Sequence, residues 1–449
     1  MFGSAFSENR RTLALAAPIA AGHVGQMLMG WVDTIMVARL GIVPLGACAF
    51  ANNLLSVPLV FGFGVLAAVS VRVAHARGSG DPSNAQQTVR GGFVIALALG
   101  AVAVVLAYAA MPLLSVFGQP AEVNRAISGY MIFCAWSLVA VFITCVPKNF
   151  CEAMGHPWAP FWILLGGVLL NAVLNFILIY GYLGFPAMGL DGAGLATLIA
   201  RVAAALALLL YPPLVRGLRS AWPVTWFAPC EPSVLRLLLL IGLPAGALHL
   251  AEVSGFAFGS LMMGWIGVEA MAAHQIAITC AATTFMVALG ISQAVCVRIG
   301  QVRGAGETYR ARPIVFGAMA ATMGFMALAA LVFTFCGRAI AGWFVSEEDV
   351  IAMTAQLLFL AALFQLFDGL QVVSSGALRG FEDTRVPMVI GMISYWAIAL
   401  PVSWFAGFVF GYGASGVWMG FIVGLGVAGL ALGWRILRKV SPNSLIPIR

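Results

Sequence analysis

The sequence predicts an all-α integral membrane protein with twelve transmembrane helices, and three observations support this fold class. Of the 449 residues, 62% are hydrophobic and only 9% are charged, whereas soluble domains carry about 25% charged residues. The apolar residues gather in long runs that short polar turns separate. The chain also repeats itself, so that its two halves read as two copies of one six-helix unit.

Twelve apolar runs are long enough to cross a bilayer, for which a helix needs about 20 residues. The first run follows Arg10 and Arg11, as the core of a signal peptide would, but it continues from Thr12 to Leu40 and is therefore expected to stay as a spanning helix. The turns between runs are too short to hold a soluble domain. The runs cover residues 12–39, 46–74, 90–112, 124–148, 160–182, 192–214, 235–265, 271–299, 313–336, 351–378, 386–409 and 415–437.

The positive charges predict how the chain is oriented. Nineteen of the 23 Lys and Arg residues fall at the termini or in the turns after even-numbered runs. Cytoplasmic loops of membrane proteins are enriched in Lys and Arg, so both termini are expected in the cytoplasm and the protein in the cell (inner) membrane. The net charge of +7 then reflects this topology. It does not indicate a nucleic-acid partner.

An internal repeat divides the chain. Residues 69–81 (VSVRVAHARGSGD) match residues 295–307 (VCVRIGQVRGAGE) at an offset of 226, which also pairs Pro18 with Pro244. We therefore expect an N-terminal lobe at 1–220 and a C-terminal lobe at 221–449, each of six helices. Because six is even, the two copies keep one orientation and should be related by a pseudo-twofold axis along the membrane normal. The two prolines are expected to bend the first helix of each lobe.

Asp368 is the acidic residue that lies deepest in an apolar run. It precedes Arg379 by eleven residues, which is roughly 16 Å of helix, and a bilayer core is about 30 Å thick. A carboxylate near the middle of a bilayer costs several kcal/mol and is a functional candidate by default. Gln365 and Gln371 flank it at three-residue spacings on one side of the helix. The structural alternative is a satisfied polar cluster between helices.

Two further acidic residues lie inside apolar runs, namely Asp33 in the first and Glu252 in the seventh. The repeat aligns Glu252 with Gln26, seven residues before Asp33. The structural alternative for Asp33 is a side chain that reaches the membrane interface, and for Glu252 it is an ion pair with His249 one turn earlier. The other thirteen acidic residues lie at the ends of runs or in turns.

Several polar and aromatic residues could support these three carboxylates. Phe256 follows Glu252 by one turn and could offer a cation–π face to an organic cation, although simple packing is the more common role of a membrane phenylalanine. Asn171 and Asn175 lie one turn apart in the fifth run, and Gln275 lies in the eighth. Hydrogen bonding between helices is the default role of such groups, and contact with a ligand or cation is the alternative.

The sequence contains little that indicates an enzyme. It has no P-loop, HExxH or GxSxG motif, its five histidines show no metal-ligand spacing, and its eight cysteines form no CxxC pair. We therefore expect no catalytic residues and no cofactor. An intramembrane protease or transferase is the enzymatic alternative, but it would not account for the repeat.

Three segments of the chain resemble the multidrug and toxic compound extrusion (MATE) family, and specifically its NorM-like branch. They are VDTIMVARLG at Val32–Gly41, AEVSGFAF at Ala251–Phe258 and FDGLQVVSSGALRGFEDTR at Phe367–Arg385. The resemblance implies two six-helix lobes around a V-shaped cleft and cation-coupled export of bulky organic cations. It also implies that Asp33, Glu252 and Asp368 are the functional acidic residues. The DinF-like branch has a carboxylate in the fifth span, where this chain has Asn171 and Asn175.

The expected function is antiport, in which sodium ions or protons enter and organic cations or drugs leave. A sodium ion needs several oxygen ligands, whereas a proton needs one carboxylate. The chain supplies enough groups for either ion. If the ion is sodium, its site is expected at Glu252 and Asp368. The expected partners are small organic cations, the coupling ion and the lipid bilayer, and the protein is expected to be a monomer. A flippase for a lipid-linked anionic precursor is the alternative, which would need cationic groups for phosphate. A receptor or channel that does not couple two fluxes is a further alternative.

Overall fold

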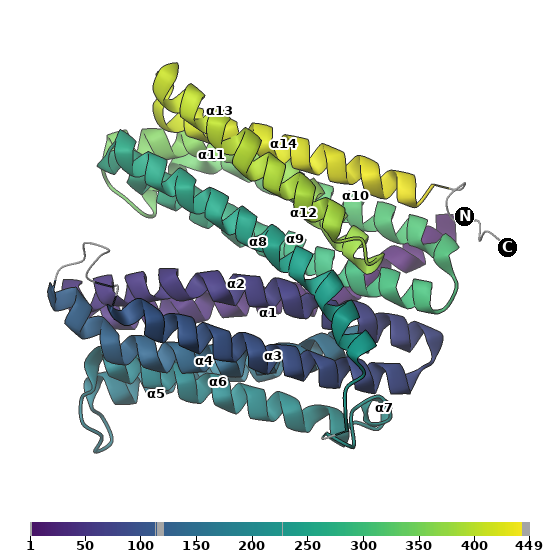
Figure 1. The fold of residues 1–449 in the computed structure, drawn as a ribbon. Coiled ribbons are helices and arrows are strands. Elements are labelled where there is room, and N and C mark those ends of the chain that lie inside the picture. Colours follow the sequence, from purple (N-terminus) through teal and green to yellow (C-terminus); the bar gives the residue numbers. More distant parts are fainter. Residues whose placement is uncertain (1, 113, 115–120, 227, 442–449) are drawn as a thin grey trace. The chain divides into compact units, whose positions relative to one another are not determined.

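The computed structural model describes residues 2–112, 114, 121–226 and 228–441, and within them all the regular structure is helical (Figure 1). Twelve stretches are long and apolar enough to cross a membrane. The first six are α1 (Phe2–Ala38), α2 (Ile42–Ser79), α3 (Pro82–Ala110), α4 (Ala121–Ala153), α5 (Trp158–Tyr180) and α6 (Gly189–Leu214). A short helix, α7 (Arg216–Arg219), precedes the second half of the chain.

The remaining spans are α8 (Pro232–Ile266), α9 (Val268–Gly304), α10 (Ala311–Gly342) with the short 3₁₀ turn η2 (Thr308–Arg310) before it, α11 (Glu348–Gly380), the composite helix at residues 385–409, and α14 (Gly413–Lys439). Each of the twelve predicted runs falls on one of these helices, so the predicted number of spans is confirmed. Most helices extend a few residues beyond the apolar run, because polar end residues continue the helix. At the start of α3, for example, Pro82 opens the helix and the Asp81 carboxylate accepts a hydrogen bond from the Asn84 N–H.

The contacts divide the chain into two compact units. Unit 2 is Ala21–Gly246, and unit 1 is Met1–Ala20 together with Ala247–Arg449. In unit 2, α4 packs against α2, α3 and α6, and in unit 1 its counterpart α11 packs against α9, α10 and α14. The fourth span of each repeat is therefore the central helix of its unit.

The two units divide the chain inside helices α1 and α8, two residues after Pro18 and Pro244. The start of α1 belongs with unit 1 because Glu8 pairs with Arg298 of α9 and Ala20 touches Gly290 of the same helix. The start of α8 belongs with unit 2 because Gly246 touches Gly64 of α2. The lobes expected from the repeat, 1–220 and 221–449, are each one continuous stretch of the sequence. These lobe boundaries stay a prediction.

Matched turns and helix ends confirm the repeat. Gly80 and Gly306, 226 residues apart, both have a positive φ (68° and 72°) where the second helix of each repeat ends. From the last turn of each of those helices an arginine side chain reaches the end of the fourth helix. Arg77 Nη1 donates to the Ala153 carbonyl over 3.3 Å, and Arg303 Nη1 donates to the Gly380 carbonyl over 3.1 Å.

The composite eleventh span differs from its counterpart α5 by two residues. Residues 385–409 number 25, whereas α5 has 23. The longer span consists of α12 (Arg385–Met392), the π-helical segment η3 (Ile393–Ala399), α13 (Leu400–Trp404) and the π-helical segment η4 (Phe405–Val409). A π-turn accommodates one inserted residue, so two such segments account for the extra length, and π-segments often lie at functional sites. The first of them contains Tyr395.

Candidate functional site

Asp368 lies in the buried centre of unit 1. Its side chain projects from α11, is only 4% exposed, and is flanked by the equally buried Gln365 and Gln371. Within the described residues, Asp368 Oδ1 and Gln371 Oε1 accept no hydrogen bond. Two buried acceptors without donors are costly, so the cluster is not the satisfied polar cluster that was the structural alternative.

Glu252 of α8 is the charged neighbour of Asp368. The two carboxyl groups interact electrostatically, and both also interact with Tyr395. The Tyr395 hydroxyl is buried and forms no hydrogen bond of normal geometry among the described residues. Two neighbouring carboxylates in an apolar environment cannot both remain charged unless a proton or a cation joins them. Unit 1 therefore contains two acidic groups that interact with each other and have no positive partner of full charge among the described contacts.

The alternative partner of Glu252 is also present. His249 Nδ1 lies 3.7 Å from Glu252 Oε2, one turn earlier on α8. This distance is longer than a charge-assisted hydrogen bond, and histidine compensates a carboxylate only when it is protonated. The pair therefore exists, but it leaves Glu252 available to a second positive group.

An aromatic cluster borders the carboxylate pair. The Phe256 ring packs edge-on against Phe364, Tyr395 and Phe421, with ring centroids 5.2–6.0 Å apart. These contacts show that Phe256 packs in the core of unit 1. Its predicted contact with an organic cation stays a prediction.

The two glutamines of this region differ in their environment. Gln365 is fastened to α9, because Thr284 Oγ1 donates to its Oε1 over 3.0 Å. Gln275, also on α9, is exposed, and none of its described contacts is with Asp368 or Glu252. Gln365 therefore belongs to the carboxylate cluster, and the structure does not bring Gln275 to it.

A second polar cluster lies in unit 2 and contains Asp33. Asn175 Nδ2 of α5 donates to Asp33 Oδ1 over 2.5 Å and to Asn171 Oδ1 over 3.2 Å. Asn171 Nδ2 in turn donates to Thr197 Oγ1 of α6 over 3.3 Å. Asp33 is therefore hydrogen-bonded between helices α1 and α5.

The same cluster continues to α4 and α2. Arg201 Nη1 of α6 donates to Ser137 Oγ of α4 over 2.7 Å. Tyr130 of α4 donates to Asn52 Oδ1 over 3.3 Å, and Cys48 contacts the Tyr130 hydroxyl. Helices α1, α2, α4, α5 and α6 thus all contribute polar side chains to the region around Asp33.

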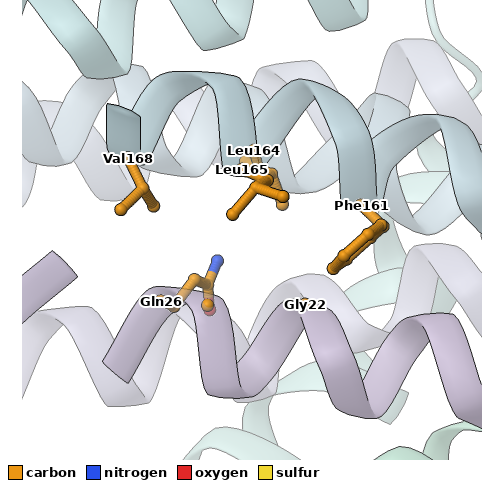
Figure 2. A pocket seen from close by; sticks show the side chains of 7 residues that line it. Gly22, Gln26, Phe161, Leu164, Leu165 and Val168 are labelled. Carbon is orange, nitrogen blue, oxygen red and sulfur yellow. The ribbon is translucent and has the colours of Figure 1, made fainter. Parts of the chain in front are cut away.

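Gln26 lies away from this cluster, in a small pocket between α1 and α5 (Figure 2). Its amide points toward α5, among the side chains of Phe161, Leu164, Leu165 and Val168. The glycines Gly22 and Gly25 complete the lining. The aligned positions Gln26 and Glu252 therefore have different surroundings in the two units.

The repeat shows how unequal the two polar centres are. At the offset of 226, Asp33 corresponds to Gly259, whose missing side chain leaves room for the Phe421 ring. The matched helix ends Ala153 and Gly380 place Asp368 opposite Val141, two residues from the Ile143 that sequence matching indicates, and both are apolar. Each unit therefore has its acidic centre at a different place in the shared scaffold.

The sequence reasoning missed Tyr395, Thr197 and Ser137. Each is a hydroxyl-bearing residue in an apolar run, so nothing in its immediate sequence distinguishes it from a packing residue. A weak signal existed for Thr197, which lies one turn before Arg201 on the same face of α6. Tyr395 is placed by a π-segment, which the hydrophobic pattern does not reveal.

The chemistry of the site is that of a transporter. Within the described part of the chain, no three His, Cys, Asp or Glu side chains group as metal ligands. What the chain holds is a duplicated bundle of spanning helices with buried carboxyl groups in each unit. Intramembrane carboxylates of this kind mark ion or substrate pathways. The fold and site therefore define a polytopic membrane transporter.

Comparison with known proteins identifies the family. The MatE family model matches twice, at residues 18–177 and 244–405, and the two matches begin 226 residues apart. A probable multidrug resistance protein NorM of Rhizobium meliloti is 33% identical over 98% of this chain and 95% of its own length. Another from Burkholderia pseudomallei is 36% identical over 95% and 92%. The chain belongs to the MATE family and to its NorM-like branch.

Solved structures agree with the fold. The crystal structure of a Vibrio cholerae MATE transporter, VcmN, superposes with a TM-score of 0.87 over 97% of this chain and 98% of that one, at 22% identity. The predicted MATE-like fold with twelve transmembrane helices is thereby confirmed. The family comprises transporters, which agrees with the expectation that this protein is not an enzyme.

Proposed function

We propose that this protein is a cation-coupled antiporter that exports bulky, mostly cationic organic compounds by alternating access. The observation that carries the proposal is the pair formed by the buried Asp368 and the half-buried Glu252, whose negative charges require a positive partner. The names of the NorM relatives, which are multidrug resistance proteins, support drug-like substrates.

The carboxylate pair can couple the flux of the coupling ion to the flux of the substrate, because binding of one cation weakens binding of the other. A proton or sodium ion that binds the pair removes the negative charge that an organic cation would need. A ligand shifts a conformational equilibrium only by its different affinities for the two states. If the coupling ion and the substrate favour opposite states, entry of one drives release of the other.

Oxygen atoms around Asp368 suit either coupling ion. Gln371 Oε1 and the Tyr395 hydroxyl are buried beside the carboxylates and have no hydrogen-bond partner in the described part of the chain. Together with the carboxylate oxygens they supply the several oxygen ligands that a sodium ion prefers. A proton needs only one of the two carboxylates. Sodium and protons therefore both stay in the proposal.

The same proposal covers the surroundings of the protein. The twelve apolar helices place it in a lipid bilayer. The distribution of Lys and Arg supports a cell (inner) membrane location with both termini in the cytoplasm. The proposal takes the protein to act as a monomer.

The test is efflux of a cationic dye from vesicles that contain the purified protein. A sodium gradient and a proton gradient are imposed separately, each with the membrane potential clamped. We expect at least one of the two gradients to drive dye efflux, and collapse of that gradient to stop it. Movement of a lipid-linked sugar phosphate without movement of the dye would replace the antiporter with a flippase. Dye movement independent of both gradients would indicate an uncoupled channel.

A further inference from the structure

Arg201 lies at the middle of α6, deep in a spanning helix. Its Nη1 donates to the fully buried Ser137 Oγ over 2.7 Å, and Ser137 Oγ donates to the Cys134 carbonyl over 2.6 Å. Among the charged residues in the described spans of unit 2, Arg201 lies farthest from the ends of its helix. An arginine at this depth is costly unless a negative group compensates its charge.

A continuous chain of side chains links Arg201 to Asp33. Thr197 precedes Arg201 by one turn of α6 and accepts a hydrogen bond from Asn171, and Asn175 bridges Asn171 to the Asp33 carboxylate. Arg201 also attracts the Asp33 carboxylate electrostatically. The arginine and the aspartate are therefore parts of one polar cluster, although each has its own hydrogen-bond partner.

The other ionisable groups around Asp33 carry no positive charge. Cys48 of α2 and Cys134 and Tyr130 of α4 interact with it electrostatically. Thiols and phenols are neutral at neutral pH in their ordinary state. The side chains from α5 are the amides of Asn171 and Asn175. Among the described neighbours of Asp33, Arg201 is thus the group that can balance its charge.

We propose that Arg201 is the built-in counter-ion of Asp33, which lets the polar cluster of unit 2 keep an ionised carboxylate without a cation taken from solution. It is a positioning residue, because it acts on the carboxylate through the cluster. A consequence for the coupling ion rests on the proposed function. If the antiport uses sodium, the ion binds at Glu252 and Asp368 and not at Asp33.

The repeat supports this pairing independently. The helices α6 and α14 both begin with a glycine at positive φ, Gly189 (56°) and Gly413 (55°), which sets their offset at 224. This places Arg201 opposite Leu425. Asp33 corresponds to Gly259, and the matched ends of α4 and α11 place Ser137 opposite Phe364.

Aspartate, serine and arginine are therefore replaced together by glycine, phenylalanine and leucine. In unit 1, Phe364 and Leu425 belong to the apolar core, and Gly259 contacts Phe421 of that core. Unit 1 has neither the acid nor the counter-ion at these positions. A joint presence in one unit and a joint absence in the other is what a charge pair requires, since either member alone would be an uncompensated charge within a spanning helix.

The two acidic centres consequently differ in charge. The unit 2 cluster holds one acid and one arginine, so its formal charge is zero. The unit 1 cluster holds Glu252 and Asp368, with His249 as its described basic neighbour. A monovalent cation is attracted to the second arrangement and not to the first.

The test reads the state of Asp33 directly, by infrared difference spectroscopy at neutral pH without sodium. Each protein is compared with its Asp33→Asn counterpart, so that the difference contains only the Asp33 carboxyl group. We expect a carboxylate band in the natural protein, a carboxylic acid band in Arg201→Gln, and a carboxylate band again in Arg201→Lys. A carboxylic acid band in the natural protein, or a carboxylate band in Arg201→Gln, would overturn the proposal.

A second variant guards against misfolding of Arg201→Gln. Ser137→Ala keeps the arginine but removes its anchor, and we expect a carboxylic acid fraction larger than in the natural protein. An unchanged spectrum would show that Ser137 does not position the charge. The loss of one hydroxyl leaves a small cavity, so this variant is expected to fold.

Sodium binding tests the consequence for the coupling ion. With radioactive sodium, Arg201→Gln is expected to bind one more ion per chain than the natural protein and to lose it when Asp33→Asn is added. Equal binding in the two proteins would show that Arg201 does not exclude sodium from unit 2. The infrared result is independent of dye efflux. If the infrared spectra are as expected but no gradient drives export, the antiport is rejected and the counter-ion proposal still holds.

Discussion

The backbone of Gly290 in α9 lies directly against Ala20 in α1. A Cβ atom added to Gly290 would stand 2.6 Å from the Ala20 Cβ. The repeat-related pair behaves alike, since a Cβ on Gly64 of α2 would stand 2.5 Å from the Gly246 Cα of α8. In both units, the first helix of one repeat thus crosses the second helix of the other at a point where only a hydrogen atom fits.

Gly290→Ala is therefore expected to destabilise the folded protein. The added methyl group meets backbone, which cannot turn aside as a side chain can, and overpacking of this kind costs about 1–3 kcal/mol. The measurement is the midpoint of thermal aggregation of the detergent-solubilised protein, followed by size-exclusion chromatography. Gly324→Ala in α10 is the matched control, because a Cβ there meets nothing within 4 Å and alanine favours a helix. Equal midpoints for the two variants would contradict the close crossing.

Asp368→Asn is expected to abolish gradient-driven dye efflux while expression and membrane insertion stay normal. Asparagine keeps the volume of the side chain but cannot bind and release a cation. Loss of a charged partner worth about 1.5–3 kcal/mol lowers affinity for the ion roughly 10- to 150-fold. Glu252→Gln should behave similarly, Asp368→Glu should retain part of the activity, and Asp33→Asn should impair transport more than cation binding.

The control for Asp368→Asn is Asp349→Asn, which removes an exposed carboxylate from the first turn of the same helix. It is expected to leave efflux unchanged at matched protein levels. If Asp368→Asn exported dye as fast as the natural protein, the role of this carboxylate would be structural. The main support for the proposed coupling would then be lost.

Tyr395→Phe is expected to weaken the dependence of export on the coupling ion without loss of stability. The buried hydroxyl makes no hydrogen bond in the described part of the chain, so its removal costs the fold little, about 1 kcal/mol or less. It does remove a polar group beside Glu252 and Asp368. The concentration of coupling ion that gives half-maximal efflux should rise, while the thermal midpoint stays as in the natural protein. The exposed Tyr412→Phe serves as control, and an unchanged ion dependence would separate Tyr395 from the site.

Glu8→Gln is expected to destabilise unit 1 strongly. Glu8 is buried and pairs with both Arg298 of α9 and Arg310 of η2. Removing one partner of a buried ion pair costs about 3–5 kcal/mol, because the other charges lose their compensation. Glu348→Gln is the comparison, since Glu348 and its partner Arg338 have side chains 69% and 65% exposed and exposed pairs contribute about 0–1 kcal/mol. The midpoint of thermal unfolding should be clearly lower for Glu8→Gln than for Glu348→Gln. Similar midpoints would show that the ion pairs of Glu8 do not stabilise the fold.

The predicted orientation is tested by labelling single cysteines in a background without the eight native ones. Ala305→Cys lies in the exposed turn after α9 and is expected to react only after the membrane is permeabilised, because that turn is rich in arginine. Asp349→Cys, at the exposed start of α11, is expected to react in intact cells. Labelling of position 305 from outside would reverse the topology.

The sequence by itself determined the twelve spans, the duplication and the three acidic residues. Apolar runs of 20 or more residues have one stable arrangement in a bilayer, a helix that satisfies its own backbone hydrogen bonds. A carboxylate within such a run is costly enough that its presence alone indicates function, so Asp33, Glu252 and Asp368 could be selected from the sequence. The repeat was visible because both copies need the same glycines at positive φ, such as Gly80 and Gly306.

Only the tertiary structure decided which groups meet. Sequence spacing relates residues along one helix, whereas Glu252 interacts electrostatically with Asp368, and Asp33 is hydrogen-bonded to Asn175, across different helices that packing brings together. Tyr395 reaches the carboxylate pair from a π-segment, whose extra residue rotates the side chains beyond it in a way that no hydrophobic pattern records. Arg201 and Asp33 are 168 positions apart in the chain. Only packing of α1, α5 and α6 places both charges in one polar cluster, where burial makes each depend on the other.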